Sequence, residues 1–216
     1  MKSLRLFILT ALLVPAGLMA QSFEGKIVYK ITYKNLPPEM QQMAAMMPGS
    51  QTLWIKGPKS RYEQNTQQAN TIVISDADSG SSTLLMEAMG QKYKLEISKE
   101  EMEQMISAQK MPEIKYIDGT KEIAGYTCKK AEVVMEGMDG PALFYYTEEI
   151  PPVQVKGMEA LQLKGMFMAY EVSTKGITIN IEASSIDKNP VDDNLFAIPG
   201  GYTAMPAQMK AMMGIK

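Results

Sequence analysis

The chain has 216 residues, with 22 basic and 24 acidic side chains and a formal net charge of −2. This near balance excludes the basic surface that nucleic acids and anionic lipid headgroups require. The absence of histidine and the single cysteine exclude an intramolecular disulfide, the common zinc and haem ligand sets, and any nucleophile that a histidine activates. We therefore expect a protein that is not an enzyme and that needs no cofactor.

The N-terminus has the pattern of a cleavable signal peptide. Two basic residues precede the apolar run Leu6–Val14, and the small Ala20 offers a cleavage site. The run is too short to cross a bilayer, and no later segment has the length for a transmembrane helix. The sequence thus predicts a signal peptide over residues 1–20 and a single domain over 21–216, exported to the periplasm or the extracellular space.

Alternating apolar and polar residues dominate the rest of the chain. The alternation is clearest in residues 26–34, 92–98 and 176–184, each with one apolar and one polar face. Turn residues separate weaker segments of the same kind. Together they predict a mainly antiparallel meander of about ten strands whose apolar face needs a cover. The weaker segments are 51–56, 59–66, 70–76, 82–88, 113–118, 126–136, 142–148 and 166–173.

Two or three short helices could supply that cover. Residues 37–47 begin with two prolines, which suit a helix start, and residues 98–112 place Ser98 and Glu101 in capping-box spacing. The tail from residue 205 is a third candidate. Their apolar faces hold Met40, Met43 and Met47 in the first helix, Met102, Met105 and Ile106 in the second, and Met205, Met209, Met212 and Met213 in the third.

The 20 methionines allow three interpretations. Methionine is an adaptable apolar residue that suits a core or a lid over a ligand, and thioether-only sites select Cu(I). The pairs Met86/Met89 and Met135/Met138 lie in or beside predicted strands, where residues three apart face opposite ways. Only the helical methionines are therefore expected to converge, and packing is favoured over copper.

Cys128 lies where the alternation changes phase. Tyr126 and Cys128 share one phase and Ala131 and Val133 the other, so we expect a β-bulge near Lys129–Lys130. A buried and unreactive thiol is the default interpretation of a lone cysteine among apolar residues.

Three segments together resemble a known family. They are "FEGKIVYKITY", "IAGYTCKKAEVV" and "SIDKNPVDDNLFAIPGGY", and they are similar to an exported bacterial family of unknown function with the periplasmic lipoprotein-carrier-like (LolA/LolB-like) fold. The resemblance spans nearly the whole mature chain. It implies an α+β fold in which a strongly curved, unclosed half-barrel sheet has helices over its concave apolar face, with a lipophilic cavity between them. The family has no assigned activity, so it supplies no functional residue.

We accordingly predict a non-catalytic binding or carrier protein for a lipophilic, acyl-chain-like ligand. The alternatives are a methionine-rich Cu(I)-binding envelope protein and a structural or interaction module whose core is filled. The residues expected to line the cavity are Met40, Met43, Met47, Met102, Met105 and Ile106 from the helices, and Tyr29, Trp54, Leu95 and Ile179 from the sheet.

Overall fold

The computed structural model describes residues 23–153, 158 and 160–212. The expected signal peptide, residues 1–20, and Met213 lie outside this part of the chain. The elements are β1 (Glu24–Lys34), α1 (Pro38–Gln41), η1 (Ala44–Met46), β2 (Ser50–Lys56), β3 (Lys59–Asn65), β4 (Ala69–Asp76), β5 (Ser81–Ala88), β6 (Gln91–Ile97), α2 (Lys99–Ser107), β7 (Glu113–Ile123), β8 (Tyr126–Val134), β9 (Ala142–Thr147), β10 (Met166–Thr174), β11 (Ile177–Asp187), η2 (Asp193–Phe196), β12 (Thr203–Ala204) and α3 (Ala207–Met212).

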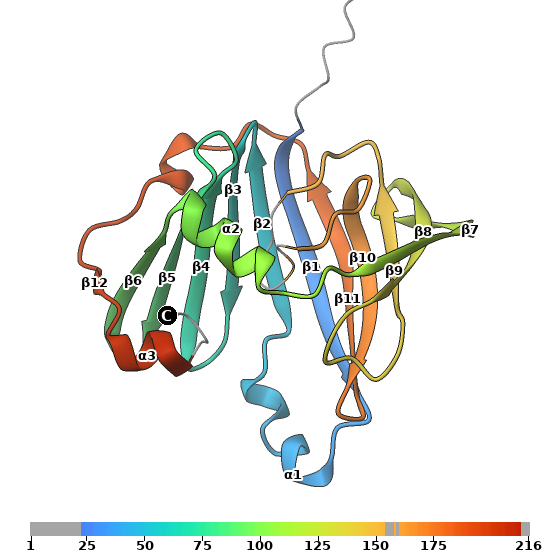
Figure 1. Ribbon diagram of the computed structural model, residues 1–216, viewed down its shortest axis with the longest axis horizontal. Coiled ribbons are helices and arrows are strands. Elements are labelled where there is room, and N and C mark those ends of the chain that lie inside the picture. The colour runs from blue at the N-terminus through green and yellow to red at the C-terminus, as the bar shows by residue number, and fades with distance from the viewer. Residues whose placement is uncertain (1–22, 154–157, 159, 213–216) are drawn as a thin grey trace, which may run out of the picture.

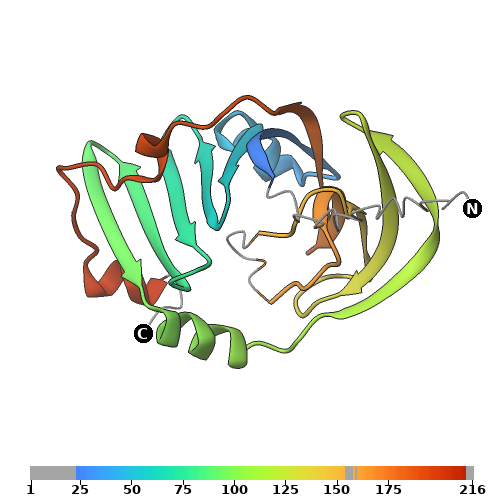
Figure 2. The same ribbon diagram turned by 90° about the horizontal axis from the view of Figure 1, so that it is seen from above.

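Within the described residues, one 12-stranded sheet has the order β12-β6-β5-β4-β3-β2-β1-β11-β10-β9-β8-β7. All neighbouring strands are antiparallel except β12, which pairs parallel with β6. The N-terminal strand β1 lies in the middle, between β2 and β11, with one meander on each side (Figure 1). Seen from above, the sheet curls into an unclosed half-barrel (Figure 2). The predicted fold class is confirmed.

One row of paired residues defines the concave face of β1–β6. Ile27 pairs with Leu53, and the row continues through Tyr62, Val73, Leu84 and Leu95. Residues directly opposite each other share a face, and alternate residues along a strand do too. The alternation that is visible in the sequence therefore places one apolar set of side chains inside the curve.

The connection between β9 and β10 enters the half-barrel and packs on β1 and β8–β11. Its described part lies inside the curve of the sheet in Figure 2. Ile150 and Leu163 belong to the same core cluster as Ile27, Phe144 and Met168. This half of the concave face is therefore filled by the chain itself.

The C-terminal segment covers the convex face of β2–β5. Val191 and Phe196 pack against Ile72, Ile74 and Leu85, so the sheet is apolar on both faces here.

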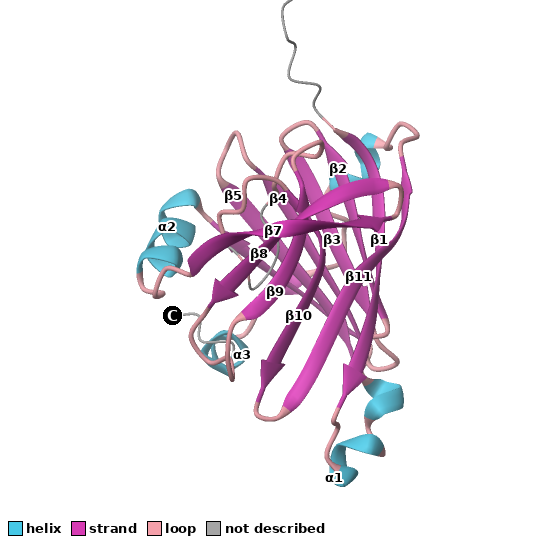
Figure 3. Cartoon of the chain, turned by 90° about the vertical axis from the view of Figure 1, so that its right-hand side faces the viewer, coloured by secondary structure: helices cyan, strands magenta, loops and turns pink. Residues whose placement is uncertain are grey.

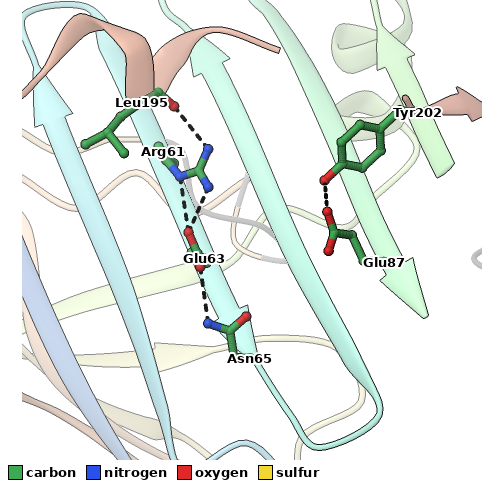
Figure 4. A network of polar contacts seen from close by, with 6 residues as sticks. All are labelled: Arg61, Glu63, Asn65, Glu87, Leu195 and Tyr202. Carbon is green, nitrogen blue, oxygen red and sulfur yellow. Dashed lines mark hydrogen bonds and ion pairs between the residues drawn. The ribbon is translucent and has the colours of Figure 1, made fainter. Parts of the chain in front are cut away.

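Polar contacts hold this C-terminal segment in place (Figure 4). The Arg61 side chain is 11% exposed; it donates to the Leu195 carbonyl oxygen and pairs with Glu63 at 2.8 Å. Further along, the Tyr202 hydroxyl donates to Glu87. This segment includes part of "SIDKNPVDDNLFAIPGGY", one of the three stretches on which the family resemblance rests, and it thus has a structural role in this chain.

Helix α2 crosses the open side of the half-barrel (Figure 2). Its predicted capping box is present, because Ser98 accepts from the Glu101 N–H while Glu101 accepts from the Ser98 N–H. Met102 is its buried residue. At the β6 edge, Met205 and Met209, the latter on α3, pack on the concave face against Leu84 and Leu95.

The first predicted helix differs from expectation. Residues 37–47 form only the four-residue α1 and the short η1, at the end of the sheet where β1 turns into β2 (Figure 3). Met43 is 55% exposed, and neither element contains a buried residue. These methionines therefore do not cover the concave face.

A register irregularity lies opposite Lys129–Lys130, but its extra residues are on the partner strand β7 and not on β8, where the bulge was predicted. Ile117 pairs with Lys130 and Thr120 with Lys129, so Asp118 and Gly119 are the inserted residues.

Next to this irregularity, Cys128 has no exposed surface. Burial raises the pKa of its thiol to about 11. At neutral pH the group is therefore a buried, protonated thiol with little nucleophilic character.

Candidate functional site

The concave face of β1–β6 carries no charged side chain. By the alternation along these six strands, each Lys, Arg, Asp and Glu lies on the convex face. The concave residues next to the apolar row are hydroxyl- or amide-bearing. They form one row of Ser60, Ser75 and Ser82 and another of Gln51, Gln64 and Thr71. The inner surface is thus apolar with neutral hydrogen-bonding groups.

This part of the concave face is only partly covered. Ile27 and Leu53, which face the β9–β10 connection, are 0% and 1% exposed. Val73 belongs to the same row of paired residues on β4, yet it is only half-buried, and so are Met86 and Tyr93. Tyr62, Leu84 and Leu95 in the same row are buried, so the accessible apolar surface on this face is limited to half-buried side chains such as Val73, Met86 and Tyr93.

Phenol groups gather between the filled and the accessible halves. The Tyr62 hydroxyl donates to Gln51 Oε1 at 3.2 Å, and the Tyr29 hydroxyl donates to the Phe167 carbonyl oxygen. Burial raises the pKa of Tyr62 to about 12, with a smaller contribution from nearby Tyr33. Burial likewise raises the pKa of Tyr170, with contributions from Tyr62 and Tyr33. The phenols therefore stay protonated and neutral.

A cleft of about 400 Å³ opens where α2 ends. It lies between the residues that follow α2, the turn that follows β8, and the β9–β10 connection. Its volume falls within the range of small-molecule sites, roughly 300–1,000 Å³. Its rim carries one cation, Lys110, and one anion, Glu136. The lining consists of Ala108, Gln109, Lys110, Pro112, Met135, Glu136, Met138, Met158, Ala160 and Leu161.

Three methionines line this cleft, and two of them were not expected from the sequence to converge. Met135 and Met138 were expected to face opposite ways on a strand, but β8 ends at Val134. Both residues lie in the following turn, where strand alternation does not apply, and both line the cleft with Met158. The signal that marks this turn is the "MDGP" sequence that follows.

Among the described residues, none of the ten predicted site residues lines this cleft. Met102, Met105 and Ile106 are the least exposed side chains of α2, which ends beside the cleft. Tyr29 is 1% exposed within the core, and Leu95 packs on the concave face against Met205. Whether any of them contacts a ligand remains a prediction.

The last two predicted site residues, Trp54 and Ile179, lie on opposite faces of the sheet. Trp54 alternates with Leu53 and lies on the convex face, where Arg61 sits 5.8 Å from its ring and the C-terminal segment covers it. It was expected inside the half-barrel, so its placement there was wrong. Ile179 pairs with Tyr33 on the concave face and packs against the core.

Metal sites and membrane-spanning helices are two further features to consider in the described ranges. No three His, Cys, Asp or Glu side chains come together there as ligands for a metal ion. None of the helices in the same ranges has both the length and the apolar character that crossing a membrane takes.

No family model matches this chain, and no curated protein does. Solved structures do resemble it. A structure of PNGF-II aligns with a TM-score of 0.57 and 15% identity over 89% of this chain and 33% of that one. A beta-barrel-like protein of the domain of unknown function DUF1849 from Brucella abortus aligns with a TM-score of 0.42 and 8% identity over 78% and 98%. The lipoprotein LppX of Mycobacterium tuberculosis aligns with a TM-score of 0.33 and 10% identity over 78% and 89%. The chain spans about a third of PNGF-II, and at this identity the match shows a shared fold alone.

Proposed function

We propose that this protein is an exported, non-catalytic binding or carrier protein for a lipid with a single acyl chain. One observation carries the proposal. The chain fills one half of its half-barrel, whereas the other half has uncharged inward side chains of which Val73, Met86 and Tyr93 are only half-buried. A methionine-lined cleft lies where α2 ends.

The chemistry of the cleft suits an acyl chain. Thioether side chains are flexible and polarisable, so they adapt to a chain without a fixed shape. Each buried methylene of a ligand contributes about 0.8 kcal/mol of transfer free energy, so a cleft of about 400 Å³ supports measurable affinity without any charge pair. The absence of histidine from the chain and the inert environment of Cys128 support a non-catalytic role.

Binding of the uncharged fluorescent probe N-phenyl-1-naphthylamine tests this proposal. We expect the wild-type protein to enhance its fluorescence and monolaurin to displace it. Met138→Asp and Leu161→Asp each put a carboxylate into the cleft, so they should weaken probe binding by about tenfold or more.

The matched control is Met89→Asp, because Met89 is 92% exposed and lies outside the cleft. It should bind like the wild type. The proposal fails if the folded wild-type protein binds neither the probe nor any single-chain lipid, or if the cleft variants bind as well as the control.

A second candidate function follows from the same cleft. Met135, Met138 and Met158 bring three thioethers to one surface, and thioether ligands select Cu(I) over harder cations. We therefore also propose this cleft as the place where the chain would hold Cu(I), if it serves as a copper-binding protein of the envelope.

Competition against a coloured Cu(I) chelator under reducing conditions separates the two functions. If copper is bound in the cleft, replacing Met135 and Met138 together by leucine should abolish one equivalent of binding, because leucine keeps the apolar volume and removes the sulfur. Met89→Leu serves as the control. Equal binding by the double variant and the control would rule this site out.

A further inference from the structure

We propose that the lipid carried in the half-barrel has an uncharged, hydrogen-bonding headgroup, such as a glycerol ester or an alcohol, and not a carboxylate or an ammonium group. This inference rests on the proposed function and adds the class of ligand. It follows from the lack of charged side chains on the concave face of β1–β6 and from the neutral hydrogen-bonding groups that this face carries.

The concave face offers no partner for an ionic head. A charge moved from water into an apolar space costs many kcal/mol unless an opposite charge accompanies it. Alternation places each charged residue of β1–β6 on the convex face. On that face the charges pair with one another, as in Arg61 with Glu63 and Lys92 with Glu87.

The same face does offer neutral donors and acceptors. Gln64 pairs with Thr71 on β4, and both are only half-buried. Gln51 precedes Thr52, whose partner is Glu63, so Gln51 and Gln64 share this level of the concave face. The Tyr62 hydroxyl donates to Gln51 and keeps its own oxygen as an acceptor. Amide and hydroxyl groups in this row match the hydroxyl and carbonyl groups of a neutral head.

The Tyr62 phenol of this surface stays protonated, and therefore neutral, near neutral pH. Burial raises the pKa of Tyr62 to about 12, so the phenol does not ionise near neutral pH. At the cleft, Lys110 and Glu136 lie on one rim with opposite charges. A carboxylate attracted by Lys110 is repelled by Glu136, so the rim as a whole favours neither sign.

Displacement of N-phenyl-1-naphthylamine from the wild-type protein by three single-chain amphiphiles with the same number of chain carbons tests this inference. The ligands are monolaurin, laurate and dodecyltrimethylammonium at about pH 8, where a carboxyl group is ionised. Monolaurin should displace the probe at a concentration about tenfold or more below that of either ion.

Two phenol variants then locate the recognition. Tyr62→Phe removes the hydroxyl that bonds to Gln51 on the concave face. It should reduce the preference for monolaurin several-fold while the probe itself still binds. Tyr116→Phe is the control, because Tyr116 is an exposed residue of the edge strand β7. It should leave the preference unchanged.

The outcomes separate this inference from the proposed function. If laurate binds as tightly as monolaurin or more tightly, and Lys110→Gln abolishes laurate binding, the head is an anion at the rim and the inference is overturned. Equal displacement by all three amphiphiles also overturns it, because the head is then not recognised, yet lipid binding stands. If neither the probe nor any lipid binds, the proposed function itself fails.

Discussion

Replacing Phe144 by alanine is expected to lower the free energy of unfolding by about 3–5 kcal/mol, the usual cost of deleting a buried aromatic ring. Phe144 has no exposed surface. Its ring stacks on Tyr170 with centroids 5.0 Å apart and an interplanar angle of 11°. Truncation leaves a cavity and removes this stacking contact, which itself contributes roughly 0.5–1.5 kcal/mol beyond burial. Denaturant unfolding followed by circular dichroism measures the change.

The neighbouring residue provides the control. Tyr145 alternates to the other face of β9, where it is only partly buried, and Lys121 and Lys130 lie over its ring. Tyr145→Ala deletes a similar ring without opening an internal cavity, so it should cost less than half as much. Equal losses in the two variants would show that Phe144 is not part of a tightly packed core.

The strands could be predicted because their signal is local. The period of two in β1 decides which side chains face inward before any partner strand is known. The same alternation could not decide which face of the sheet Trp54 on β2 occupies. In the run Leu53, Trp54, Ile55, three successive apolar residues give no phase. Trp54 is covered by the C-terminal segment around Leu195, and nothing in the sequence near β2 encodes that contact.

The helix over the open side of the half-barrel was predicted correctly where both the methionine spacing and the length of the segment suited a helix. The prediction failed where only the spacing did. Around α2, a capping box and a continuous apolar face define a nine-residue helix. In residues 37–47 the methionines have helical spacing, but the chain forms a four-residue helix and a separate 3-10 turn. Short isolated helices gain little from spacing alone, because a tertiary contact must stabilise them.

The cleft was harder to foresee because its walls are far apart in sequence. Residues that follow α2 and β8 meet Met158, Ala160 and Leu161 only after the sheet has curled. The rule that removed Met135 and Met138 from consideration is valid within a strand. It failed because the strand ends at Val134, two residues before the predicted end at residue 136. The predicted strand exists, and it is the position of its end that allows Met135 and Met138 to line the same cleft.

Gly165→Ala is expected to destabilise the protein by roughly 3 kcal/mol, at the upper end of the cost of overpacking. Gly165 lies at the end of the β9–β10 connection, just before β10. An added Cβ would overlap the carbonyl oxygen of Thr147 and lie 2.6 Å from its carbonyl carbon and 2.9 Å from the Glu148 Cα. These are backbone atoms, so the connection or the end of β9 must move to make room.

Gly49→Ala is the matched control, because a Cβ there meets nothing within 4 Å. Without a clash, this change should leave stability unchanged or raise it by up to about 1 kcal/mol through the unfolded chain. Thermal unfolding of the two variants measures the difference, and N-phenyl-1-naphthylamine binding reports on the half-barrel. Since the β9–β10 connection fills one half of the concave face, a shift at Gly165 should alter probe binding in the protein that remains folded. Equal stability of the two variants would show that the connection tolerates displacement, and the division of the half-barrel into a filled and an accessible half would then not be a fixed property of the fold.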